Sequence, residues 1–172
     1  MTQATKVKIV TGKVRFSYAN VFQPKASVEG GTPKYSVSII IPKSDKETIA
    51  KIQKAFEDTK AGSAAYFGGA VPKALKGGLR DGDAEKEDPA YEGSYFINAN
   101  SAQRPGVVDA ELNPIMDLEE FYSGCYGRAS ITFYPYNAQG SKGIACGLNN
   151  VQKLEDGEKL GGATSAAADF AV

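Results

Sequence analysis

The sequence predicts a mainly β protein with a minor α component, on three observations. Several short runs alternate apolar and polar residues, as strands with one buried face do. Glycine- and proline-rich segments separate these runs, and a single stretch repeats its apolar residues at helical spacing. Five or so strands with glycine-rich corners and one helix between them favour an OB-fold-like, five-stranded antiparallel barrel with long loop insertions. A β-sandwich is the rival architecture.

The expected strands follow one another along the whole chain. The first spans residues 7–18 and is interrupted by Gly12, and the next spans residues 34–41 and ends at a proline. Residues 20–33 lie between them and are expected to form a loop because they contain two prolines and two glycines. The remaining strands are expected at residues 93–99, 123–136 and 143–153.

One helix is expected after the second strand. Ser44 and Glu47 have the spacing of a capping box, which marks a helix start. Apolar residues then recur at helical spacing to about Lys60, at Ile49, Ile52, Ala55 and Phe56. The glycine-rich residues 62–78 are expected to form a long irregular loop that packs down through its few apolar side chains.

The bulk properties predict one domain that needs neither disulfide nor metal to fold. A chain of 172 residues can bury a sizeable core, so residues 1–160 are expected to form a single OB-fold-like domain. Residues 161–172 are rich in alanine and glycine and are expected to form a flexible tail. No apolar run approaches the roughly 20 residues that span a bilayer. No export signal is recognised at the start of the chain, so we expect a cytoplasmic protein.

The chain lacks histidine, which removes the commonest general base and the commonest zinc ligand. Cys125 and Cys146 lie in apolar strand-like runs and are expected to be buried thiols rather than a bridge or a metal pair. We therefore expect no enzyme, no cofactor and no metal site. A Mg²⁺-dependent nuclease stays open as an alternative, because carboxylates such as Asp81, Asp83 and Asp109 could serve it.

An acidic stretch at residues 81–92 superficially matches a calcium-binding loop, with acids at the first, third, fifth and twelfth positions. Lys86 stands at the sixth position, where that loop needs glycine, and Pro89 interrupts it. We therefore expect a solvated or self-shielding loop. Neither a Walker nor a Rossmann glycine pattern is present, so no nucleotide cofactor is expected.

The formal net charge of zero hides a strong asymmetry. Residues 1–80 carry fourteen Lys and Arg against five Asp and Glu, a net charge of +9, and residues 81–172 carry six against fifteen, a net charge of −9. A basic half can offer phosphates a favourable surface while the acidic half stays away from nucleic acid or occupies the basic groove in its absence. The alternative is that charges close in sequence scatter over the folded surface.

The strand expected at residues 124–136 carries the sharpest chemical signal. Strict alternation sends its side chains to two faces, and the core face is expected to hold Cys125, Ala129, Ile131 and Phe133. The other face holds Tyr126, Arg128, Ser130, Thr132, Tyr134 and Tyr136. Exposed phenol rings beside a guanidinium suit unstacked bases, because aromatic stacking is tolerant of sequence and arginine adds phosphate contacts. The alternative is that the tyrosines favour a strand and pack under loops.

Seven runs of the chain resemble segments of a known protein family. They are KVRFSYANVFQPK (13–25), PKYSVSIIIPKSD (33–45), LRDGD (79–83), YFINANS (95–101), PGVVDA (105–110), YSGCYGRASITFYPYN (122–137) and GIACGLNNVQKLEDGEKLGG (143–162). From about Lys6 to Gly162 the chain resembles a family of tailed-phage proteins, long catalogued as a domain of unknown function and associated with phage single-stranded DNA-binding proteins.

The resemblance implies an OB-fold core with added elements and sequence-independent binding of single-stranded DNA. It also implies service in phage replication, recombination or repair in the cytoplasm of the infected bacterial host, beside phage replication or recombination proteins. Proteins of this role often end in an acidic segment that recruits polymerase. Only Asp169 and Phe170 match that pattern here, with Glu155, Asp156 and Glu158 upstream, so recruitment through this terminus stays in doubt.

The candidate DNA-binding residues come from the alternation argument and not from the resemblance. Basic residues would neutralise phosphates and aromatic rings would stack on bases. The candidates are Lys13, Arg15, Tyr18, Phe22, Lys25, Lys34, Tyr126, Arg128, Tyr134 and Tyr136. Besides the nuclease, a non-enzymatic virion or interaction protein stays open, although the aromatic and basic strands speak against it.

Overall fold

The computed structural model describes residues 6–26, 31–73, 75–138 and 140–160. The described strands are β1 (Val7–Val10), β2 (Val14–Lys25), β3 (Lys34–Pro42), β4 (Arg80–Asp81), β5 (Ser94–Ser101), β6 (Gly106–Val108), β7 (Tyr126–Ala138) and β8 (Ser141–Glu155). The described helices are α1 (Lys46–Ala61), the short α2 (Gly82–Glu85) and the 3-10 helix η1 (Pro89–Tyr91). The predicted tail at residues 161–172 lies outside the described residues.

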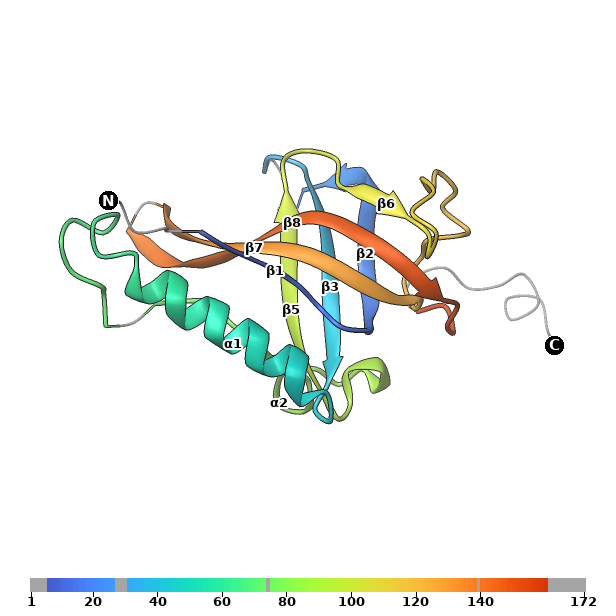
Figure 1. Cartoon of the computed structure of the whole chain (residues 1–172), viewed down its shortest axis with the longest axis horizontal. Coiled ribbons are helices and arrows are strands. Elements are labelled where there is room, and N and C mark those ends of the chain that lie inside the picture. The colour runs from blue at the N-terminus through green and yellow to red at the C-terminus, as the bar shows by residue number, and fades with distance from the viewer. Residues whose placement is uncertain (1–5, 27–30, 74, 139, 161–172) are drawn as a thin grey trace.

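Five of the strands close into a ring, as an OB-fold-like barrel requires. β2 pairs with β3, β3 with β5, β5 with β8, β8 with β7, and β7 returns to β2 (Figure 1). The predicted mainly β fold with a five-stranded ring is confirmed, with one refinement. Four of the five pairings are antiparallel, but β5 and β8 meet in parallel at Asn100 and Gly147. β1, β4 and β6 are additions that pair with β7, β5 and β8 respectively.

The first predicted strand is two strands, and the loop predicted after it is mostly strand. At the break between β1 and β2, the Thr11 amide still donates to the Ala129 carbonyl of β7, but the Gly12 amide donates to Thr48 Oγ1 of α1 and so leaves the β1–β7 ladder. β2 then continues to Lys25 because it pairs with β3 through two register shifts. Such bulges absorb extra residues without ending a strand, and local residue types do not reveal them. The prediction of a loop over residues 20–33 was therefore wrong up to Lys25.

The predicted helix is present as α1, but its cap differs from the prediction. Asp45, not Ser44, is the N-cap, and its carboxylate accepts a hydrogen bond from the Thr48 amide at 3.1 Å. The apolar face of the helix turns inward, with Ile49, Ile52 and Ala55 buried. α1 packs against β1, β7 and β8 and covers one side of the barrel (Figure 1). It is not long and apolar enough to cross a membrane, and neither are the other described helices.

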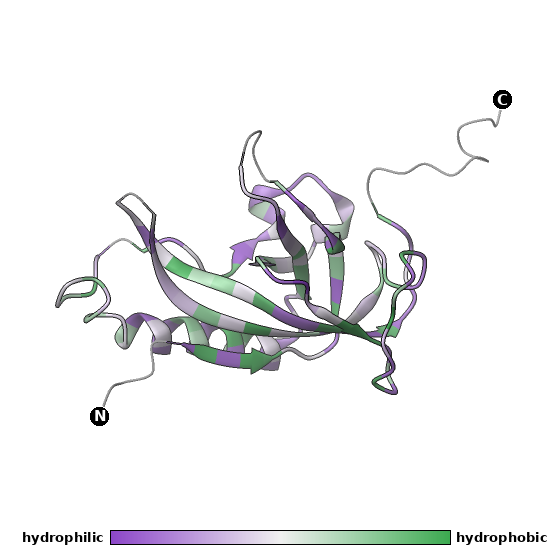
Figure 2. Cartoon of the chain, turned by 90° about the horizontal axis from the view of Figure 1, so that it is seen from above, coloured by the Kyte–Doolittle hydropathy of each residue, from purple (hydrophilic) through white to green (hydrophobic). Residues whose placement is uncertain are grey.

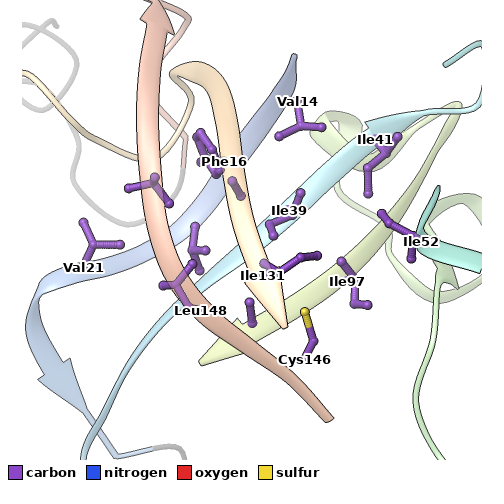
Figure 3. Packing of buried hydrophobic residues seen from close by; sticks show 14 of the residues in the cluster. Val14, Phe16, Val21, Ile39, Ile41, Ile52, Ile97, Ile131, Cys146 and Leu148 are labelled. Carbon is purple, nitrogen blue, oxygen red and sulfur yellow. The ribbon is translucent and has the colours of Figure 1, made fainter. Parts of the chain in front are cut away.

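The inward-facing apolar side chains of all five ring strands fill the barrel interior. Figure 3 shows Phe16 of β2, Ile39 of β3, Ile97 of β5 and Leu148 of β8 in one cluster, around Ile131 of β7. The alternation that places them there appears as bands of hydropathy along the strands in Figure 2. The core face predicted for residues 124–136 is confirmed, because Cys125, just before β7, and Ala129, Ile131 and Phe133 within it are all buried.

The two cysteines are buried and free, as predicted. Burial raises the pKa of both thiols, most strongly that of Cys146 on β8, because a thiolate would lose its hydration there. Both side chains therefore act as small apolar groups in the barrel wall.

The central position of Ile131 makes a direct test of this core. We expect Ile131→Ala to lower the free energy of unfolding by about 2–5 kcal/mol, because a fully buried side chain leaves a cavity. Val10→Ala on β1, where the side chain is 37% exposed, is the matched control and should cost less than about 1 kcal/mol. Urea unfolding followed by circular dichroism measures both, and equal effects would contradict this account of the core.

Candidate nucleic-acid interface

The outer face of β3 and β5 forms a shallow polar floor. The inward positions of these strands hold core residues such as Ile39 and Ile97. Alternation therefore sends the intervening side chains outward. Two cross-strand pairs of small polar residues result, Ser36 opposite Asn100 and Ser38 opposite Asn98. Small hydroxyl and amide groups leave room above this part of the sheet for a ligand.

Two adjoining hollows of about 670 and 660 Å³ lie above this floor and share Asn98 and Asn100. The first extends to the β7–β8 hairpin and to the segment before β4, and its walls include Lys34, Lys76, Arg80, Tyr134, Tyr136 and Ala145. The second extends toward β2 and α2, and its walls include Tyr18, Ser36, Ser38 and Lys86. We refer to the two hollows together as the groove.

The hairpin supplies two tyrosines whose rings lie over small residues of β8. Tyr136 pairs with Gly143, where a Cβ would lie 2.7 Å from the Tyr136 ring. A Cβ at Gly147 would lie 3.1 Å from the Tyr134 ring. The glycines therefore let the rings lie against the strand at the wall of the groove. Burial raises the pKa of the Tyr134 hydroxyl above its ordinary value of 10.

Tyr18 reaches the groove from the opposite side because β2 bulges at this position. The β2–β3 register shifts between Ser17 and Asn20, and Tyr18 has a φ of 47°, in the left-handed region that non-glycine residues rarely adopt. The side-chain amide of Asn20 donates from Nδ2 to the Tyr18 carbonyl at 3.2 Å. The ring is 58% exposed. Strain of this kind is often found at functional positions.

Four cations line the groove, and none of the described residues that line it is a carboxylate. They are Lys34, Lys76, Arg80 and Lys86. Lys76 donates to Ser141 at the hairpin at 3.0 Å, and the Arg80 guanidinium donates two hydrogen bonds to Glu85. These contacts hold the two side chains at defined places on the groove wall, and the ion pair with Glu85 partly neutralises the charge of Arg80.

Lys86 lies among three aromatic rings at one end of the groove. Its ammonium lies 5.4 Å from the ring centre of Tyr18, 5.3 Å from that of Tyr91 and 5.4 Å from that of Phe96. Such cation–π contacts orient a flexible side chain. They place this positive charge beside the exposed Tyr18 ring.

The same end of the groove is closed by the segment from α2 to η1. The Tyr91 ring packs on Ile40 and Phe96, and its hydroxyl donates to Ser38 at 2.9 Å. Lys43 ties the start of the segment to the barrel, with its ammonium 2.9 Å from a carboxylate oxygen of both Asp81 and Asp83. The acidic stretch at residues 81–92, predicted as a solvated or self-shielding loop, thus has a definite anchor.

The structure gathers several of the predicted site residues at the groove. Tyr18, Lys34, Tyr134 and Tyr136 line it, and Lys25 lies directly across from Lys34 in the β2–β3 pairing. These residues come from strands that are distant in sequence. The predicted combination of aromatic and basic side chains therefore exists as one surface.

Three other predicted residues lie together at a separate hollow of about 250 Å³. Lys13 and Arg15 flank the Tyr126 ring at 5.5 and 5.3 Å from its centre. Lys13 pairs with Glu155, and Arg15 donates to the backbone carbonyls of Gly124 and Glu158. These cations already have partners within the protein.

The last two predicted residues make structural contacts. Phe22 is partly buried against the core, with the Arg104 guanidinium 5.6 Å from its ring centre. Arg128 is exposed, and its Nε donates to the Thr11 carbonyl at 3.2 Å. The strand alternation was predicted correctly, but β7 is long and twisted, so its outer face passes through several environments.

Sequence reasoning missed several groove residues, among them Lys76, Arg80, Lys86, Asn98 and Asn100. Asn98 had a usable signal, because it alternates with Ile97 and Ala99 in the strand predicted at residues 93–99, whereas Asn100 lies just beyond that prediction. Lys76 lies in an irregular segment, Arg80 in the two-residue strand β4 and Lys86 in an acidic stretch, and none of these has a periodicity that predicts a direction.

The carboxylates proposed for a nuclease are engaged in other contacts. Asp81 and Asp83 bind Lys43, and the Asp109 carboxylate accepts hydrogen bonds from the amides of Glu111 and Asn113 at 2.9 Å. Among the residues that the structure describes, no group of three His, Cys, Asp or Glu side chains has an arrangement that could hold a metal ion.

The comparisons with known proteins agree with this geometry. A family model described as "Enterobacter phage Enc34, ssDNA-binding protein" matches residues 7–172. Protein p50 of Acyrthosiphon pisum secondary endosymbiont phage 1 is 30% identical over 172 residues, 95% of this chain and 92% of that one.

The chain is also similar to solved structures. The single-stranded DNA-binding protein of bacteriophage Enc34, in complex with ssDNA, matches with a TM-score of 0.78 and 30% identity over 90% of this chain and 89% of that one. Gp2.5, a single-stranded DNA-binding protein encoded by bacteriophage T7, matches with a TM-score of 0.64 over 97% and 96% of the two chains. At 16% identity the latter likeness concerns the fold alone.

The Lys43 anchor predicts a pH dependence of the groove end. The hydrogen bond from Lys43 lowers the pKa of Asp81 and Asp83 below the ordinary 3.8. The stability that the two ionised carboxylates give the segment from α2 to η1 is therefore fully present above pH 3.8, and it is lost as the pH falls through the lowered pKa. We expect Lys43→Met to shift this loss upward to about pH 4. The Gly93 amide donates to the Asp83 carboxylate at 2.9 Å, so the protection of this amide from hydrogen exchange, measured against pH, follows the loss.

The matched control for this experiment is Lys51→Met on the exposed side of α1, which should leave the exchange profile unchanged. An unchanged profile in Lys43→Met, with protection corrected for intrinsic exchange, would show that Lys43 does not anchor the segment.

Proposed function

The chain belongs to the Enc34-type family of phage single-stranded DNA-binding proteins, and we propose that it binds single-stranded DNA in the groove above β3 and β5. The observation that carries the proposal is the composition of that groove. Aromatic rings and cations from separate parts of the chain line it, and the described residues on its walls include no carboxylate. Polyanionic strands with unpaired bases have both features that such a surface recognises.

Stacking supplies the preference for single strands. Tyr134 and Tyr136 lie on one side of the groove and Tyr18 on the other. Each base offers a π face only when it is unpaired and unstacked, and stacking on an aromatic ring contributes about 1–3 kcal/mol per base. A duplex keeps its bases inside the helix, so the same rings gain little from it.

The cations neutralise the phosphates between the stacked bases. Lys34 and Lys76 lie near the hairpin, whereas Arg80 and Lys86 lie near β4 and α2. Hydroxyl and amide groups on the floor, such as Ser36 and Asn98, can bond to sugars or base edges. Neither stacking nor phosphate contacts depend on base identity, so binding should be independent of sequence.

The role that follows is to coat and protect single-stranded DNA during phage replication, recombination or repair in the infected bacterial cell. We propose that the protein binds the strand without cleaving it, since Asp81, Asp83 and Asp109 are engaged within the fold. We take residues 1–160 as the binding domain.

The hairpin tyrosines give the first test. We expect Tyr134→Ala with Tyr136→Ala to weaken binding of a fluorescent single strand by about 5- to 150-fold for each base stack lost. Fluorescence anisotropy at fixed salt measures it, with the matching duplex for comparison. Tyr66→Ala is the control on a strand of about 12 nucleotides, which holds one protomer, because Tyr66 is half exposed and lies outside the groove. Equal affinity of the double variant and the parent would refute stacking at the hairpin, and a strand cut in the presence of Mg²⁺ would reveal a nuclease.

Salt dependence tests the electrostatic part independently. We expect Lys34→Gln to reduce the slope of log affinity against log salt concentration by about 0.7, as the loss of one contact to single-stranded phosphate should. Lys51→Gln on α1 is the control for general charge and should leave the slope close to that of the parent protein. An unaltered slope in Lys34→Gln would remove Lys34 from the binding surface.

A further inference from the structure

Residues 109–120, between β6 and β7, form a loop that exposes apolar side chains. Leu112 is 69% exposed, Met116 71% and Leu118 61%, so one short segment holds three of the large exposed apolar residues in the described chain. The same segment carries five acids and no basic residue. We name it the acidic loop. An exposed apolar cluster rimmed by charge is typical of a protein interaction site.

The acidic loop is held in one conformation, as a docking surface requires. The Ile115 amide donates to the Val107 carbonyl at 2.8 Å, and the Phe121 amide donates to the Asp117 carbonyl at 3.2 Å. The side chains of Ile115 and Phe121 are buried at its two ends. Leu112 has a φ of 70°, a strained value for a leucine. The apolar groups are therefore presented by a fixed backbone.

A complementary surface lies on the same molecule. Residues 60–73 contain two basic residues, Lys60 and Lys73, and no acid. Neither lines the groove, whereas Lys76 and Arg80, which follow this segment, do. The ring of Tyr66 is 50% exposed in this segment and packs edge-on against Phe67 at 5.1 Å. We name it the basic segment. It offers the two features that the acidic loop lacks, which are positive charge and an exposed aromatic ring.

The two surfaces lie at opposite ends of the long axis. The stretch that follows α1 lies at the left end of Figure 1, and the loop between β6 and β7 lies at the right end. The view from above in Figure 2 gives the same separation. One molecule therefore cannot bring its own two surfaces together.

We propose that the acidic loop docks on the basic segment of a second copy of this chain, so that neighbouring protomers on one DNA strand join head to tail. The inference rests on the proposed function. A single strand has a direction, and a groove that binds it in one orientation places successive protomers in that same orientation. Contacts between them must then join two different surfaces, which repeat along the strand without closing. A charged and apolar patch at each end meets that requirement.

Charge reversal tests the contact without altering the groove. Glu119→Lys with Glu120→Lys reverses the acidic loop, and Lys60→Glu with Lys73→Glu reverses the basic segment. None of the four lines the groove. The control for the acidic loop is Glu47→Lys with Glu57→Lys, which makes the same change of charge on the exposed face of α1.

DNA single strands of two lengths separate the binding of one protomer from the assembly of several. A strand of about 12 nucleotides holds one protomer and reports affinity, whereas one of about 100 nucleotides holds several and reports cooperativity by mass photometry and gel shift. We expect either reversed variant to bind the short strand within about threefold of the parent and to lose about tenfold in cooperativity on the long strand. An equimolar mixture of the two variants should restore clustering, because each reversed loop then meets a reversed segment.

The outcomes are distinct. If the parent protein fails to bind the short strand, the proposed function itself is wrong. If the parent binds the short strand but fills the long one at random, or if the reversed variants still cluster, the head-to-tail contact is overturned. Failure of the mixture to restore clustering also overturns it, since misfolding of one variant is excluded by its binding to the short strand.

Discussion

The fold and the groove both depend on the pairing of β7 with its neighbours. β7 joins β1 and β2 along one edge and β8 along the other, and this second edge closes the five-stranded ring. Its inward side chains, Ala129, Ile131 and Phe133, fill the barrel. Its outward side chains near the hairpin, Tyr134 and Tyr136, form a wall of the groove. A slip of one residue in this pairing would exchange the two sets, so core packing also fixes the position of the tyrosines.

The outer face of the barrel is divided between a structural part and a binding part. Where β3 and β5 place Ile40 and Phe96 outward, Tyr91 covers them. Where the same strands place serine and asparagine outward, the surface remains open. The boundary lies at Ser38, which accepts the Tyr91 hydroxyl hydrogen bond. The segment from α2 to η1 thus covers the apolar half of the face and leaves the polar half accessible to a nucleic acid strand.

The charged residues are likewise divided between the groove and ion pairs within the fold. The basic residues that line the groove come from both halves of the sequence, since Lys34, Lys76 and Arg80 belong to the basic half and Lys86 belongs to the acidic half. Several acids of the second half bind lysines of the first, as Asp83 binds Lys43 and Glu155 binds Lys13. The strong asymmetry of the sequence is therefore partly neutralised by folding. What remains is a basic groove and an acidic loop at one end of the molecule.

The sequence by itself determined the mainly β class, α1, the two faces of β7 and the buried cysteines, because these features follow from local periodicity and apolar character. It also predicted four groove residues, Tyr18, Lys34, Tyr134 and Tyr136. Only the tertiary structure decided which aromatic and basic residues meet. Ring closure, the bulge at Tyr18 and the twist of β7 depend on contacts between strands that lie far apart in the chain. Local pattern carries no information about those contacts, so Lys13, Arg15 and Tyr126 were expected beside residues from which the fold separates them.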